Sequence, residues 1–64
     1  MNDKVIQDAL EMILTGDYDL SDTAFEELVG VSTFEDAGVM TQNSGLVLRM
    51  ADGSEFQLTI VKSR

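Results

Sequence analysis

The sequence predicts an α+β domain in which two N-terminal helices pack on one face of a three-stranded antiparallel meander. Three observations lead to this fold class. Apolar residues recur at spacings of three and four in the first part of the chain, they alternate with polar residues after Val39, and short glycine-containing segments separate the alternating runs. With 64 residues, the chain is long enough for one small domain, residues 1–64.

The first predicted helix runs from Asp3 to Thr15. Asp3 is expected to cap it, and Gly16 is expected to end it in a left-handed conformation. Its residues draw one apolar stripe that would face the core, made of Val5, Ile6, Ala9, Leu10, Ile13 and Leu14.

A second helix is predicted to begin at Ser21 and to end at Gly30. With Ser21 as the N-cap, Leu20 and Phe25 take the positions of a hydrophobic staple. Its apolar face would consist of Ala24, Phe25, Leu28 and Val29.

One further helical turn fits residues 33–37. Ser32 and Glu35 have the spacing of a capping box, and Gly38 could end the turn.

The two clearest strands are Leu46 to Met50 and Glu55 to Val61. A two-residue turn at Asp52 and Gly53 would pair Met50 with the carboxylate of Glu55, which argues against that register. A three-residue loop of residues 51–53 with a left-handed Gly53 gives chemically sensible partners instead. The predicted pairs are Leu48 with Phe56, Leu46 with Leu58, and Arg49 with Glu55.

The same reasoning predicts a second three-residue loop at residues 43–45, which would pair Met40 with Leu48 and Thr41 with Val47. The helices would then cover a sheet face made of Met40, Leu46, Leu48, Phe56, Leu58 and Ile60. The opposite face would be rich in valine and would carry Val39, Thr41, Val47, Arg49, Gln57, Thr59 and Val61. An exposed β-branched face beside an open edge strand makes a homodimer an alternative to a monomer.

The residue types argue against an enzyme. The chain contains no cysteine and no histidine, so nucleophilic catalysis of the usual kind and Cys/His metal sites are excluded. An EF-hand loop starting at Asp17 would need glycine and glutamate where the chain has Asp22 and Leu28. We therefore expect no catalytic residue, no cofactor and no metal ion.

Negative charge is concentrated in the first part of the chain. Residues 1–38 hold ten acidic residues against Lys4 alone, a net charge of −9, whereas residues 39–64 carry +1, which together give the −8 of the whole chain. Such a field repels nucleic acid and anionic membranes and attracts basic protein surfaces. The residues expected to bind a partner are Asp17, Asp19, Asp22, Glu26, Glu27, Glu35 and Asp36.

The N-terminal residues lack the basic region of a signal peptide, and no apolar run is long enough for a membrane span. We therefore expect a cytoplasmic protein, located in the host cytoplasm if a phage encodes it.

In size and charge the chain resembles the small acidic proteins that phages and other mobile elements encode to block host machinery, including DNA mimics and anti-CRISPR proteins. One segment is similar to a small acidic anti-CRISPR family, through Asp22, Ala24, Glu26, Glu27, Gly30, Val31 and Ser32. The resemblance implies an inhibitor that occupies a nucleic-acid groove of a protein complex. The acidic residues named above come from the charge distribution, and no functional residue is carried over from the resemblance.

The leading hypothesis is therefore a non-enzymatic inhibitor or adaptor whose acidic helical face docks on a basic, nucleic-acid-binding surface of a partner protein, without binding nucleic acid or membrane itself. The alternative is a structural module that self-associates through the valine-rich sheet face and the strand Glu55 to Val61.

Overall fold

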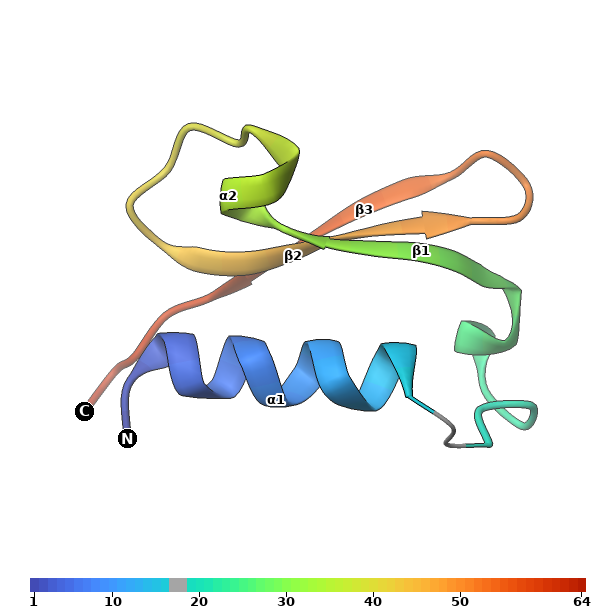
Figure 1. Ribbon diagram of the computed structural model, residues 1–64, viewed down its shortest axis with the longest axis horizontal. Coiled ribbons are helices and arrows are strands. Elements are labelled where there is room, and N and C mark those ends of the chain that lie inside the picture. The colour runs from blue at the N-terminus through green and yellow to red at the C-terminus, as the bar shows by residue number, and fades with distance from the viewer. Residues whose placement is uncertain (17–18) are drawn as a thin grey trace.

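The computed structural model describes residues 1–16 and 19–64. Its sheet has three antiparallel strands in the order β1-β2-β3, so the predicted α+β class with a three-stranded meander is confirmed (Figure 1). Only one of the two predicted N-terminal helices is present. The elements in chain order are α1 (Asp3–Thr15), the 3-10 turn η1 (Ala24–Glu27), β1 (Leu28–Thr33), α2 (Phe34–Ala37), β2 (Ser44–Met50) and β3 (Glu55–Ile60).

Helix α1 has the predicted bounds, but both of its ends differ in detail from the prediction. The N-cap is Asn2 and not Asp3, because the Asn2 side chain accepts a hydrogen bond from the Val5 amide at 2.9 Å. At the other end, Gly16 has an extended backbone with φ −84°, so the expected left-handed cap is wrong. In the last turn, the Thr15 hydroxyl donates a hydrogen bond to the Glu11 carbonyl at 2.7 Å.

The predicted second helix over residues 21–30 is wrong. Thr23, not Ser21, accepts the capping hydrogen bond from Phe25, and only the four-residue turn η1 follows it. The chain then extends as β1, whose sequence LVGVST is rich in β-branched residues that suit a strand. Pairing with β2 supplies the backbone hydrogen bonds that a helix would otherwise have made.

The short helix α2 confirms the helical turn expected near residues 33–37. Its N-cap is Thr33 and not Ser32, since the Thr33 hydroxyl accepts a hydrogen bond from the Asp36 amide at 3.1 Å. Gly38 ends the helix with φ +75°, the left-handed conformation predicted for it.

The hairpin of β2 and β3 has the predicted register. Met50 donates a hydrogen bond to the Ser54 carbonyl at 2.9 Å and accepts one from Gly53 at 3.1 Å, which closes the three-residue loop 51–53. All three predicted pairs are present: Leu48 with Phe56, Leu46 with Leu58, and Arg49 with Glu55.

The predicted partner of β2 on its other side is wrong. Val47 pairs with Ser32 and Leu48 with Val31, so residues 28–33 replace the expected strand around Met40 and Thr41. Residues 43–45 consequently form no hairpin loop, because Ser44 already begins β2. A strand distant in the sequence has thus taken the place of the adjacent segment.

Gly53 has φ +92°, where a β-branched residue is strained. Replacing Gly53 with valine should therefore lower the free energy of unfolding by about 1–2 kcal/mol. Asparagine tolerates this conformation better than valine does, so Gly53→Asn is the matched control. Its free energy of unfolding should fall much less. Urea unfolding followed by circular dichroism measures both, and a valine variant as stable as the asparagine variant would contradict the strain.

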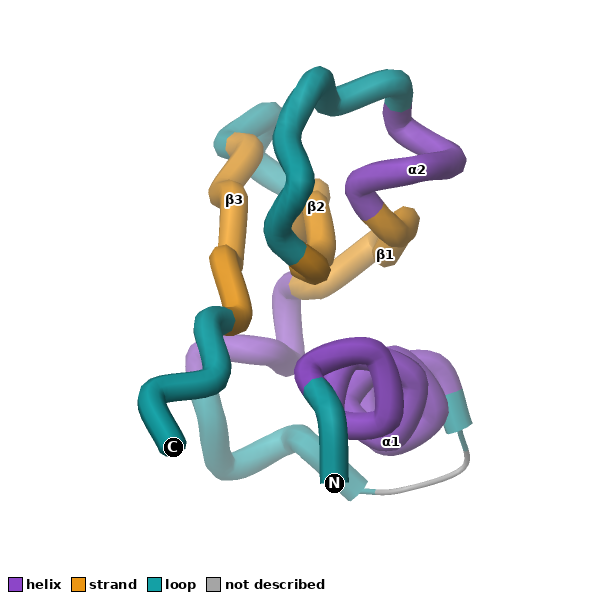
Figure 2. Tube along the Cα trace, turned by 90° about the vertical axis from the view of Figure 1, so that its left-hand side faces the viewer, coloured by secondary structure: helices purple, strands orange, loops and turns teal. Residues whose placement is uncertain are grey.

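Helices α1 and α2 lie on opposite faces of the sheet; the prediction placed the helices of residues 3–15 and 21–30 on one face and gave the turn at residues 33–37 no face. Figure 1 shows α1 along one side of the strands and α2 on the other, and Figure 2 shows the same separation end-on. A Cβ atom on Gly45 would collide with the Phe34 ring, so α2 covers the face to which Gly45 and, two residues on, Val47 belong. Val47 is 1% exposed, and this buries part of the valine-rich face that was predicted to be free.

The core is centred on β2, which is covered on both faces. In the described part of the chain, the apolar side chains that are buried are Phe34, Leu46, Val47 and Leu48. Several residues predicted for the core are exposed instead, including Met40 on the loop after α2 and Phe56 and Leu58 on β3. The centre of the sheet is therefore well covered, and β3 is not.

Candidate functional site

The predicted acidic residues lie in three successive segments and not on one helical face. Asp19 and Asp22 precede η1, Glu26 and Glu27 belong to η1, and Glu35 and Asp36 belong to α2. All six side chains are exposed. Asp17, the seventh predicted residue, lies outside the described residues.

The segment before η1 is shaped by local hydrogen bonds. The Asp19 carboxylate accepts hydrogen bonds from the Ser21 amide at 3.0 Å and from the Ser21 hydroxyl at 2.6 Å. These bonds lower the pKa of Asp19, the side-chain hydroxyl having the larger effect. Asp19 therefore stays charged at neutral pH and also holds a turn, so it has a structural role in addition to its charge.

Strand β1 separates the acidic residues into two groups. We call Asp19, Asp22, Glu26 and Glu27 the η1 group, and Glu35 and Asp36 the α2 group. The six residues of β1 lie between the groups, and a strand of this length spans about 20 Å. Between Asp19 and Asp36 the sequence contains six acidic residues and no lysine or arginine. The structure thus places negative charge at both ends of β1, and the Arg49 guanidinium, which donates a hydrogen bond to the Ser32 hydroxyl at 3.1 Å, lies between the two groups.

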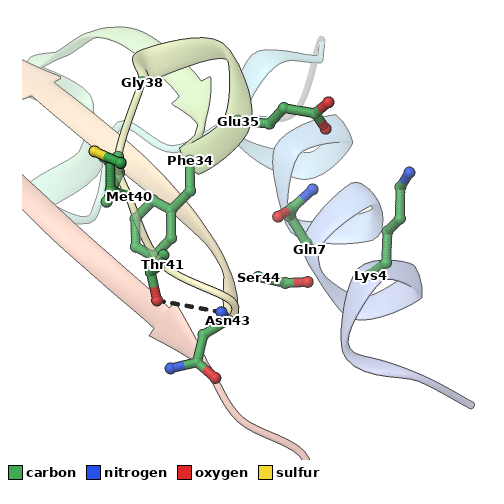
Figure 3. A pocket seen from close by; sticks show the side chains of 10 residues that line it. Lys4, Gln7, Phe34, Glu35, Gly38, Met40, Thr41, Asn43 and Ser44 are labelled. Carbon is green, nitrogen blue, oxygen red and sulfur yellow. Dashed lines mark hydrogen bonds between the residues drawn. The ribbon is translucent and has the colours of Figure 1, made fainter.

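A hollow of about 460 Å³ lies between the N-terminal half of α1, α2 and the loop that precedes β2 (Figure 3). Its charged lining residues are Lys4 and Glu35, and Phe34 and Met40 add apolar surface. The Ser44 hydroxyl at its edge is hydrogen-bonded to Asp3, and this bond is the main cause of the lowered pKa of Asp3. Of the six described acidic candidates, the hollow includes Glu35 only, so it is not the centre of the acidic surface.

Residues 1–16 and 19–64 contain no group of three acidic side chains that could hold a metal ion together. Within the same residues, no helix is long and apolar enough to cross a membrane.

A second surface, which the sequence did not predict, consists of exposed apolar residues. We call it the α1–β3 surface; its residues are Ile6 and Ile13 of α1 and Phe56 and Leu58 of β3. Their side chains are between 38% and 56% exposed. The sequence does contain a signal for it, because the apolar residues of α1 cover a wider arc than one sheet can bury.

The apolar arc of α1 is divided between the sheet and solvent. Residues that are buried or half-buried recur at Gln7, Leu10 and Leu14 and mark the side that packs on the strands. Successive residues of an α-helix are about 100° apart around its axis. Ile6 and Ile13 therefore lie on one flank of the side that packs on the strands, and Lys4 lies on the other flank. The flank of α1 that carries Ile6 and Ile13 is therefore only partly covered, and these two residues are 38% and 43% exposed.

Comparisons with family models, curated proteins and solved structures gave no match to the chain.

Proposed function

We propose that the chain is a non-enzymatic, cytoplasmic inhibitor or adaptor that docks on a basic, nucleic-acid-binding surface of a partner protein. The observation that carries this proposal is the exposure of all six described acidic residues at the two ends of β1, in a segment without a basic residue. An electrostatic field of this kind steers association with a basic surface and opposes binding to nucleic acid.

The distance between the two acidic groups suits an extended basic groove. The η1 group and the α2 group lie about 20 Å apart along β1. In duplex DNA each strand carries one phosphate per about 3.4 Å of helix axis, so this length corresponds to about six base pairs. A groove that holds a short stretch of nucleic acid therefore has the length to contact both groups at once.

The first test is a pull-down from lysate at low and at high salt after nuclease treatment. Docking through charge should be strong at low salt and should weaken steeply as the salt concentration rises, because ions screen exposed charges. A captured partner should then be purified with a bound oligonucleotide, which the chain should displace on titration. A partner that retains its oligonucleotide while it binds the chain would contradict docking in the groove.

The charge-reversal test uses Glu26→Lys with Glu27→Lys, which leaves the turn-forming Asp19 unchanged. Like charges brought together at a basic surface cost several kcal/mol, so affinity for the captured partner should fall at least about 100-fold. Exposed substitutions of this kind change the free energy of unfolding by about 0.5 kcal/mol or less.

The matched control is Asp8→Lys with Glu55→Lys, an equal change of net charge at exposed positions on α1 and β3. This control should reduce binding only slightly. Equal losses from the two pairs would mean that net charge alone drives binding, and full binding by the Glu26 and Glu27 variant would overturn the proposal.

A further inference from the structure

The chain exposes more surface than a folded monomer of its size. Its accessible surface is 4826 Å² for a mass of 7.0 kDa, whereas monomeric proteins of that mass expose about 4,000 Å². The difference of roughly 800 Å² equals the share that each partner buries in an interface of standard size. The α1–β3 surface contributes to this excess, since its four residues are apolar and exposed.

The two parts of the α1–β3 surface lie on the same side of the molecule. Lys4 and Gln7 line the hollow together with α2, so the flank of α1 that carries Ile6 and Ile13 is the one turned away from α2. Figure 2 shows β3 on that side of α1. Phe56 and Leu58 pair with Leu48 and Leu46, and α2 covers the opposite face, so their side chains are on the α1 face of the sheet.

Strand β3 also has a free edge, because the sheet order of the described strands is β1-β2-β3. Its pairing with β2 runs from Glu55 to Ile60 without a register shift, so this edge is regular. The other edge strand differs, since β1 is interrupted by a shift between Leu28 and Gly30 and has an acidic group at each end. Bulges and charges protect an edge from pairing with another chain, and β3 lacks the bulge.

Backbone groups of β3 point outwards at alternate residues. Met50 and Ser54 form a hydrogen-bonded pair beside the loop, so the next pair, Arg49 with Glu55, is not hydrogen-bonded, and the alternation continues along the hairpin. The amides of Gln57 and Thr59 are therefore directed to the free edge. Gly45 is the residue of β2 opposite Thr59, and its amide donates a hydrogen bond to Gln7 and not to β3. This is the direction expected for a pair that is not hydrogen-bonded.

We propose that the chain forms a two-fold symmetric homodimer in which β3 pairs antiparallel with β3 of a second copy, covering the α1–β3 surface of both. A two-fold axis perpendicular to the sheet makes the two sheets continuous and keeps both α1 helices on the same face. Ile6, Ile13, Phe56 and Leu58 of each copy then lie between the helices and the joined strands.

Charge favours a second copy as the occupant of this surface. Each residue of the α1–β3 surface is uncharged, and the α2 group belongs to the opposite face of the sheet. The η1 group lies at the loop end of the hairpin, where the Glu27 carbonyl accepts a hydrogen bond from the Ala51 amide, and antiparallel pairing of β3 with β3 puts these ends of the two copies at opposite ends of the interface. Two chains of net charge −8 can therefore meet here without bringing their acidic groups together. The dimer leaves the acidic groups free, so it does not depend on the function proposed above.

Sedimentation equilibrium tests the dimer directly. The purified chain should have about twice the 7.0 kDa mass of one copy, and raising the salt concentration should keep or tighten the dimer because it screens the repulsion between acidic copies. A mass of one copy at every concentration up to the millimolar range would overturn the proposal. Docking on a basic partner has the opposite salt dependence, so failure of one proposal is distinguishable from failure of the other.

Two substitutions locate the interface. Thr59→Pro removes an outward amide without removing a bond to β2, and it should raise the dimer dissociation constant at least tenfold, whereas Thr59→Ala should leave it unchanged. Ile13→Lys should have a similar effect through the α1 flank. Its control, Thr15→Lys, adds the same charge on the polar flank of α1 and should have little effect.

Far-UV circular dichroism checks the fold of each variant. If Thr59→Pro does not fold, the comparison of Ile13→Lys with Thr15→Lys decides alone. A dimer that tolerates Ile13→Lys as well as it tolerates Thr15→Lys would place the interface elsewhere and overturn the proposal.

Discussion

Replacing Gly45 with alanine is expected to lower the free energy of unfolding by about 3 kcal/mol, at the upper end of the usual cost of overpacking a core. The added Cβ would lie far inside van der Waals contact with the Phe34 ring and 2.5 Å from the Leu58 carbonyl oxygen. The oxygen belongs to the backbone of the neighbouring strand, and Phe34 is 4% exposed, so neither can move away easily. A domain of this size has a total stability of only about 3–10 kcal/mol.

Gly30→Ala is the matched control, because the same methyl group there would find its nearest neighbour, the Arg49 side chain, at 3.6 Å. That is ordinary contact, and alanine in place of a strand glycine should be neutral or mildly stabilising. Urea unfolding at one fixed protein concentration compares the two variants. Similar midpoints would mean that the close packing of Phe34 on Gly45 does not hold in solution.

Replacing Gln7 with leucine is expected to cost about 1–3 kcal/mol, the penalty for a buried polar group without a partner. Gln7 is 8% exposed, and its side-chain oxygen accepts a hydrogen bond from the Gly45 amide at 2.9 Å. Leucine has a similar volume but no acceptor, so the Gly45 amide would be left unsatisfied. This single bond also joins α1 to β2, which makes it a long-range contact between helix and sheet.

Lys4→Leu, one turn earlier on α1, serves as the control, since Lys4 is exposed and the change should stay within about 0.5 kcal/mol. Amide hydrogen exchange adds a site-specific measurement. The Gly45 amide should exchange slowly in the parent chain and much faster in the leucine variant. Equal protection of this amide in both would show that Gln7 is not its partner.

The candidate site could be predicted from the sequence in its composition but not in its shape. The run from Asp19 to Asp36 is visibly acidic and free of lysine and arginine, and the structure confirms that its six acidic side chains are exposed. Its division into two groups depends on β1, whose first residues, 28–30, were predicted as the end of the second helix. A continuous acidic helix face was therefore expected where the structure has two separated groups.

The exposed apolar surface was missed for a related reason. Periodicity shows that Ile6, Ile13, Phe56 and Leu58 lie on apolar faces, but not whether another element covers those faces. The prediction assumed a second helix over the same side of the sheet. That segment forms η1 and the start of β1 instead, so the flank of α1 and the α1 face of β3 are only partly covered.

The sequence by itself determined the features that depend on neighbours in the chain. The bounds of α1, the register of the β2–β3 hairpin and the left-handed Gly53 follow from helical spacing, matched cross-strand pairs and a short loop. Only the tertiary structure decided the strand that pairs with the other edge of β2, the side on which each helix lies, and the exposure of the apolar residues. The physical reason is that β1 forms by backbone pairing with β2, which lies far along the chain, and the residue spacing within 28–33 does not identify that partner.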